Sequence, residues 1–100
     1  MNKDIIRLRI SAQNSLLGRI TKEVRAIYLS LDKACINLYV IIDGNISKYW
    51  KDTICEIGTD IITDFNYPYI INERIKRVDH PNKLSFLSNE IYVYKRYEDE

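Results

Sequence analysis

The segment from Ala34 to Ile42 constrains the fold of this chain more than any other part of the sequence. Every second residue in it is apolar, at Ala34, Ile36, Leu38, Val40 and Ile42. Because successive side chains of a β-strand point to opposite faces of a sheet, this row predicts a strand with one covered face. Residues 24–31 alternate in a similar way, and Asp32 and Lys33 between the two segments suit a tight turn. We therefore expect these two strands to form a β-hairpin.

Two other segments have the apolar spacing of amphipathic helices. The first lies between Asp4, a suitable N-cap residue, and Gly18, a suitable stop, and its apolar face is formed by Ile5, Leu8, Ala12 and Leu16. The second follows the turn 43–45, and either Asn45 or Ser47 can cap it. Its apolar face is formed by Trp50, Ile54, Ile57 and Ile61. This helix is expected to end at residues 65–68, because Pro68 cannot continue helical hydrogen bonding.

The C-terminal third of the chain predicts two more strands. Residues 69–78 alternate only weakly, which favours an edge strand or a curved strand. Residues 80–83 predict a loop, and residues 84–87 predict a single packed turn. The last strand is expected at residues 91–97, with Ile91 and Val93 on one face and Tyr92 and Tyr94 on the other.

Together these elements predict an α+β fold in the order αββαββ. A four-stranded, mainly antiparallel sheet with both helices on one face satisfies every apolar row and leaves the other sheet face open. One hundred residues suit a single domain spanning 1–100. The side chains expected in the core are those of Ile27, Leu29, Ile36, Leu38, Val40, Ile54, Ile57 and Ile61.

Charge and composition favour a cytoplasmic protein. The formal net charge of +1 produces no strong overall field, so neither a broad nucleic-acid footprint nor a polybasic membrane anchor is expected. Charged residues interrupt the apolar ones near the N-terminus, unlike in a signal peptide, and the longest apolar run, residues 38–42, is too short to cross a membrane. Cys35 and Cys55 are therefore expected to be reduced thiols.

Residues that could carry catalysis are scarce. His80 is the only histidine, and with the two cysteines it provides three of the four ligands that a structural zinc site needs. The glycines Gly18, Gly44 and Gly58 are too far apart to form a phosphate-binding loop. We therefore expect a protein that is not an enzyme, with no catalytic residue, cofactor, metal or small-molecule substrate.

The second helix carries the first candidate binding surface. Four carboxylates recur at steps of four residues and form one acidic ribbon, at Asp52, Glu56, Asp60 and Asp64. Such a ribbon suits a basic partner, although a solvated helix face has the same appearance. Because like charges at this spacing repel one another, we expect that reversing some of them leaves the fold intact.

The open sheet face is the second candidate surface. Four tyrosines are expected to point outward there, at Tyr28, Tyr39, Tyr92 and Tyr94, with basic residues at its margins, at Arg25, Arg74, Lys76 and Arg96. Tyrosine with arginine is typical of protein interfaces and also of surfaces that stack single-stranded RNA. Alternatively, these tyrosines only reflect the preference of β-strands for aromatic residues.

Several segments of the sequence resemble a group of small bacterial proteins from toxin–immunity loci, including contact-dependent growth inhibition systems. The similar segments are residues 12–20, 24–27, 43–44, 59–65, 77–81 and 93–98. The resemblance implies a cytoplasmic inhibitor that binds one cognate toxin domain, commonly a nuclease, and masks or distorts its active site. A small RNA-binding or regulatory module that uses the tyrosines is the alternative, and a homodimer whose sheets pack face to face is compatible with either.

Overall fold

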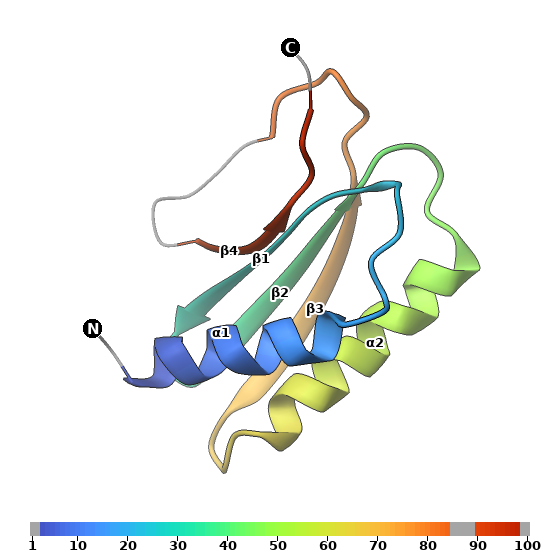
Figure 1. The fold of residues 1–100 in the computed structure, drawn as a ribbon. Helices are drawn as coiled ribbons and strands as arrows, with labels where there is room; N and C mark the ends of the chain where they lie inside the picture. Colours follow the sequence, from blue (N-terminus) through green and yellow to red (C-terminus); the bar gives the residue numbers. More distant parts are fainter. Residues whose placement is uncertain (1–2, 85–89, 99–100) are drawn as a thin grey trace.

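The computed structural model describes residues 3–84 and 90–98. Its elements are α1 (Lys3–Leu16), β1 (Val24–Asp32), β2 (Cys35–Ile42), α2 (Lys48–Thr63), β3 (Ile70–Arg77) and β4 (Ile91–Lys95). Figure 1 shows two helices packed on one four-stranded sheet. The predicted α+β class and the order αββαββ are therefore confirmed.

The strands β1 and β2 form the predicted hairpin. Asp32 pairs with Cys35, so the two-residue turn consists of Lys33 and Ala34, one residue later than expected. Lys33 adopts the left-handed conformation, with φ of 56°, as tight hairpin turns require. The alternating row of β2 is fully buried beyond the turn, at Ile36, Leu38, Val40 and Ile42.

The sheet is mixed, so the prediction of a mainly antiparallel sheet is confirmed only in part. The strand order is β3-β2-β1-β4, and β1 runs antiparallel to both of its neighbours, whereas β3 runs parallel to β2. The reason lies in α2, which carries the chain back along the sheet, so that β3 starts at the same end as β2. The predicted edge position of β3 is confirmed, and its residues alternate between exposed and half-buried as far as Lys76.

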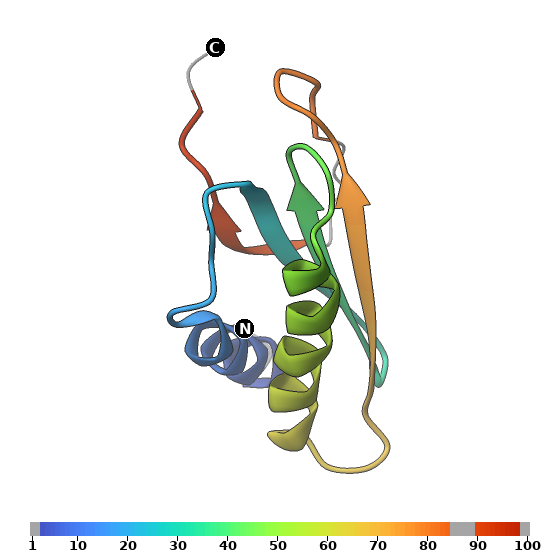
Figure 2. The same ribbon diagram turned by 90° about the vertical axis from the view of Figure 1, so that its right-hand side faces the viewer.

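The main core lies between the sheet and the helices, which both cover the same sheet face (Figure 2). All eight side chains predicted for the core are buried. Trp50 is also fully buried, and its indole Nε1 donates a hydrogen bond to the Thr21 hydroxyl at 2.7 Å. Ser47 caps α2 by accepting from the Trp50 amide, which was one of the two predicted caps.

A β-bulge in β4 changes which way its tyrosines point. Tyr92 pairs with Tyr28, but Tyr94 pairs with Ile27, so Val93 is an extra residue between the two pairs. Because paired residues point to the same sheet face, Tyr94 follows Ile27 into the main core. The prediction that Tyr92 and Tyr94 share a face is therefore wrong, since regular alternation does not hold across a bulge.

The sheet face without helices is not open, which corrects the prediction of an open face. Ala26, Tyr28 and Ile41 form a small buried cluster there, and half-buried side chains pack around it, at Tyr39, Val78, Leu84 and Tyr92. The chain between β3 and β4 must pass from one sheet edge to the other, and it brings Val78 and Leu84 onto this face (Figure 1). The packed turn predicted at residues 84–87 lies mostly outside the described residues.

Candidate partner-binding surface

The second half of the acidic ribbon is used to join the two helices. The Asp60 carboxylate accepts hydrogen bonds from Ser15 at 3.1 Å and from Arg19 at 2.7 Å, and these bonds lower the pKa of Asp60. The Asp64 carboxylate accepts from the Ser11 hydroxyl at 2.6 Å, and Arg7 donates to the Asp64 carbonyl. The ribbon was expected to contain only like-charge repulsion, but reversing the charge of Asp60 or Asp64 would also break contacts with α1.

We expect replacement of Asp60 by alanine to lower the free energy of unfolding by about 1 kcal/mol, because it removes an ion pair and leaves the buried Ser15 hydroxyl without a good acceptor. Asp52→Ala is the matched control on the same helix, since Asp52 pairs only with the exposed Lys48 among the interactions described. Urea unfolding followed by circular dichroism measures both. Equal midpoints for the two variants would show that the bonds of Asp60 to α1 carry no stability.

The first half of the ribbon faces outward and is extended by a residue that the sequence did not reveal. Burial, and then the carboxylates of Glu73, Asp52 and Glu56, raise the pKa of the Cys55 thiol. Glu73 on β3 therefore lies closest to Cys55 on α2, with Asp52 and Glu56 within electrostatic range of the same thiol, and we call these three carboxylates the acidic patch. Because its pKa is raised, the Cys55 thiol stays protonated at neutral pH and is a poor nucleophile.

Glu73 reaches the patch because Gly58 leaves room for it. A Cβ atom added at Gly58 would lie 2.6 Å from the Glu73 carboxylate, so the Glu73 side chain occupies the space above this glycine. In the sequence, Glu73 shares a row with Ile71 and Ile75, which indicates the helix side of β3. The neighbours of Glu73 depend on the parallel pairing with β2, which the sequence did not reveal.

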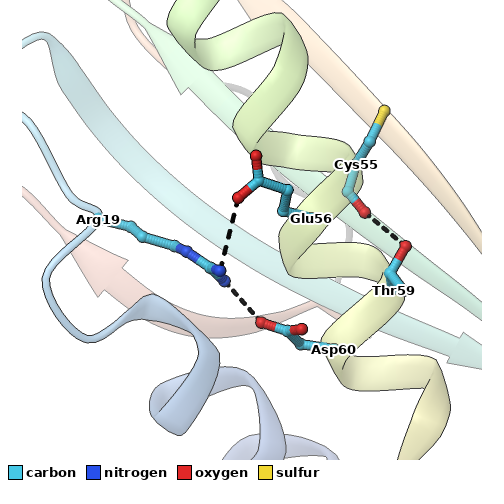
Figure 3. A pocket seen from close by; sticks show the side chains of 5 residues that line it. All are labelled: Arg19, Cys55, Glu56, Thr59 and Asp60. Carbon is cyan, nitrogen blue, oxygen red and sulfur yellow. Dashed lines mark hydrogen bonds and ion pairs between the residues drawn. The ribbon is translucent and has the colours of Figure 1, made fainter.

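A shallow depression of about 370 Å³ lies between the acidic patch and the joined ends of the helices. It is lined by Arg19, Cys55, Glu56, Thr59 and Asp60. Figure 3 shows the Arg19 guanidinium reaching from the end of α1 to the carboxylates of both Glu56 and Asp60. Arg19 lies 3.6 Å from Glu56, whose side chain remains 60% exposed. Glu56 can therefore still form an ion pair with a cationic side chain of a partner.

The tyrosine face offers little free aromatic surface. Tyr28 stacks on Tyr39, with ring centroids 4.7 Å apart, and is only 5% exposed. Burial, followed by the nearby Glu90 charge, raises the pKa of Tyr28 to about 12. Tyr39 and Tyr92 are half-buried around it, and Tyr94 lies on the opposite face. Because base stacking needs exposed rings, this arrangement counts against the RNA-binding alternative.

Two of the basic residues predicted at the margin of that face belong to a semi-buried ion network. Arg25 is buried and binds both oxygens of Glu98, through Nε at 2.7 Å and Nη2 at 2.9 Å. Its Nη1 donates to the carbonyls of Val78 and Asn82. Arg96 contacts Glu98 as well and also donates to Asp43 at 3.0 Å. These residues therefore hold the C-terminal segment to the sheet and are not available to a partner.

The described residues contain free thiols and no candidate metal centre. Cys35 and Cys55 are unpaired thiols. Among residues 3–84 and 90–98, no cluster of three or more histidine, cysteine, aspartate or glutamate side chains could hold a metal ion. In the same part of the chain, no helix has the length and apolar character needed to cross a membrane.

Comparison with known proteins identifies a family. The family model described as MafI2 immunity protein matches residues 5–98. No curated protein matches the chain. The match confirms the resemblance to toxin–immunity proteins, whereas the narrower link to contact-dependent growth inhibition stays a prediction. The segments that carried the resemblance meet in the structure, since residues 12–20 and 59–65 form the contact between the helices, and residues 24–27, 77–81 and 93–98 form the ion network.

Proposed function

This chain belongs to the MafI2 immunity protein family, and from this premise we propose that it blocks its toxin by binding it directly in the cytoplasm. An immunity protein neutralises a toxin, so the partner of this chain is a cognate toxin. The match over residues 5–98 is the observation that carries the proposal, because it spans nearly the whole chain. Inhibition by binding requires no chemistry on this side of the complex.

We propose that the acidic patch of Asp52, Glu56 and Glu73 contacts the toxin. Glu56 and Asp52 keep 60% and 59% of their side-chain surface exposed, so they can meet lysines and arginines of a partner. Complementary charge accelerates association and fixes the orientation of docking. Asp60 and Asp64 are less suited to this role, because their oxygens already accept bonds from α1.

A nuclease is the class of toxin that best fits such a patch. Nucleases that bind DNA or RNA present basic surfaces to the phosphate backbone, and this contact provides much of their affinity. An acidic surface that covers those basic residues competes with the nucleic acid for the same charges. The proposed inhibition is therefore occupation of the toxin's substrate-binding surface.

The test is survival of bacteria that produce the cognate toxin, which we expect to be encoded beside this gene. Cells that express the toxin domain alone are expected to die, whereas cells that also express this chain are expected to grow. A non-cognate toxin of another activity is the control, and it should kill in the presence or absence of this chain. Death of both strains with the neighbouring toxin would reject the proposed function.

A further inference from the structure

The outer edge of β3 is a long and regular strand edge. Each residue of β3 pairs with one residue of β2, from Ile70 with Cys35 to Arg77 with Ile42, without a register shift. Among the described residues, no strand pairs with its other side. The opposite sheet edge is different, because β4 is shorter and is interrupted by a bulge. Bulges and short strands protect an edge from pairing, and β3 has neither.

The backbone hydrogen-bond groups on this edge can be assigned by position. The Ile70 amide donates to the Ala34 carbonyl at 2.9 Å, and the Val78 amide donates to the Ile42 carbonyl at 3.0 Å. A regular parallel ladder repeats every two residues, so the even-numbered amides of β3 point toward β2. The odd-numbered amides, which include those of Ile71, Glu73 and Ile75, therefore point outward from the sheet.

The charges on β3 argue against a second copy of this chain as the occupant. In antiparallel pairing of two β3 strands, facing residues point to the same side of the sheet. The two central registers, which pair the most residues, then place Glu73 opposite Glu73 or Arg74 opposite Arg74, and one of the two next registers places Arg74 opposite Lys76 twice. Like charges directly opposite one another destabilise a strand pair.

We propose that an extended segment of the toxin pairs with the outer edge of β3 and continues the sheet. Carboxylates on that segment would lie beside the exposed Arg74 and Lys76, and apolar side chains would lie beside the half-buried Ile71 and Ile75. Glu73 belongs to this edge and to the acidic patch, so the strand and α2 form one continuous docking surface. This inference rests on the proposed function, since the occupant is the toxin.

Amide hydrogen exchange measured by NMR tests the pairing directly. The probe is the toxin domain encoded beside this gene, added to the full chain. Exchange of the Ile71, Glu73 and Ile75 amides is expected to slow by about tenfold or more on binding, while the even-numbered amides are already protected in the free protein. Tight binding without new protection at these three amides would overturn the inference and leave the proposed function standing.

Two variants at one position separate the backbone from the charge. Glu73→Ala removes the carboxylate and keeps the outward amide, whereas Glu73→Pro removes both and is compatible with an edge strand. Proline is expected to weaken toxin binding about tenfold more than alanine does, because it deletes one inter-strand bond and places its ring in the path of the partner. Equal affinities for the two variants would contradict strand pairing.

Three further outcomes decide between strand pairing with the toxin, pairing with a second copy, and no toxin binding. Calorimetry that detects no binding of the toxin would reject the proposed function itself. Protection of the odd-numbered amides that rises with protein concentration, in the absence of toxin, would assign the edge to a second copy and overturn the inference. If Glu73→Pro does not fold, the exchange pattern of the unmodified protein still decides between strand pairing and docking elsewhere.

Discussion

Replacing Glu98 by alanine is expected to lower the free energy of unfolding by about 3 kcal/mol. The replacement removes both hydrogen bonds between Arg25 and the carboxylate and leaves a guanidinium that is 4% exposed without its counter-ion. Breaking one partner of a buried ion pair is costly because the remaining charge stays away from water. Arg96 loses one of its two carboxylate partners at the same time, since it pairs with both Asp43 and Glu98.

The same pair predicts how stability depends on pH. Hydrogen bonds from Arg25, assisted by Arg96, lower the pKa of Glu98 from 4.5 to about 2. A carboxyl whose pKa is lower in the folded protein contributes stability that is complete above its unfolded pKa and is lost as the pH falls. Unfolding free energy should therefore decrease between about pH 4.5 and pH 2 more steeply in the unmodified protein than in Glu98→Ala.

Urea unfolding at pH 7 and at pH 3 measures both effects. Glu98→Gln keeps the shape of the side chain and loses its charge, so it separates packing from ionisation. Asp32→Ala is a control at an exposed carboxylate beside the hairpin turn. A midpoint for Glu98→Ala equal to that of Asp32→Ala at pH 7 would show that the network of Arg25 and Glu98 does not hold the C-terminal segment.

Reversing two charges of the acidic patch is expected to have the largest effect on toxin binding. The double variant Glu56→Lys with Glu73→Lys should weaken binding by about 2–5 kcal/mol, because it places two cations against a basic surface that is desolvated on docking. The fold should tolerate Glu56→Lys, since Glu56 makes only an exposed contact with Arg19 at 3.6 Å among the described residues, whereas Glu73 is half-buried over Gly58, so the fold of the double variant is checked directly. Isothermal titration calorimetry gives the affinity, and circular dichroism checks the fold.

A matched control distinguishes local contact from net charge. Asp32→Lys changes the charge by the same amount as Glu56→Lys, but Asp32 is an exposed residue at the end of β1, beside the hairpin turn and not on α2. Affinity is therefore expected to fall for Glu56→Lys and to stay within about twofold for Asp32→Lys. An equal loss for both single variants would mean that only the overall charge matters, and α2 would no longer be the proposed contact.

Local patterns were sufficient to predict most of the fold. The rows in β2 and α2 have strict periods of two and about 3.6 residues, and every side chain that they placed in the core is buried. The direction of β3 could not be read in this way, because a strand has the same alternation whether it is parallel or antiparallel. The bulge at Val93 was also invisible, since it depends on how β4 pairs with β1.

The binding surface was predicted only in part, for a similar physical reason. The spacing of Asp52 to Asp64 correctly indicates one helix face, but it does not show that Ser11, Ser15 and Arg19 would bond to half of it. Glu73 lies against α2 because β3 pairs in parallel with β2, and Arg25 meets Glu98 from 73 residues away. Contacts between distant segments follow from the register of the sheet, which no local pattern specifies.

The most direct test of inhibition by binding is a titration of the purified toxin domain with this protein, followed by the toxin's own activity. A non-catalytic inhibitor acts by occupying the toxin, so activity should fall in proportion to the protein added and cease near a fixed molar equivalent. That endpoint should not change with incubation time. Loss of activity at a small fraction of an equivalent, increasing with time, would reveal an enzyme acting on the toxin and contradict the proposed mechanism.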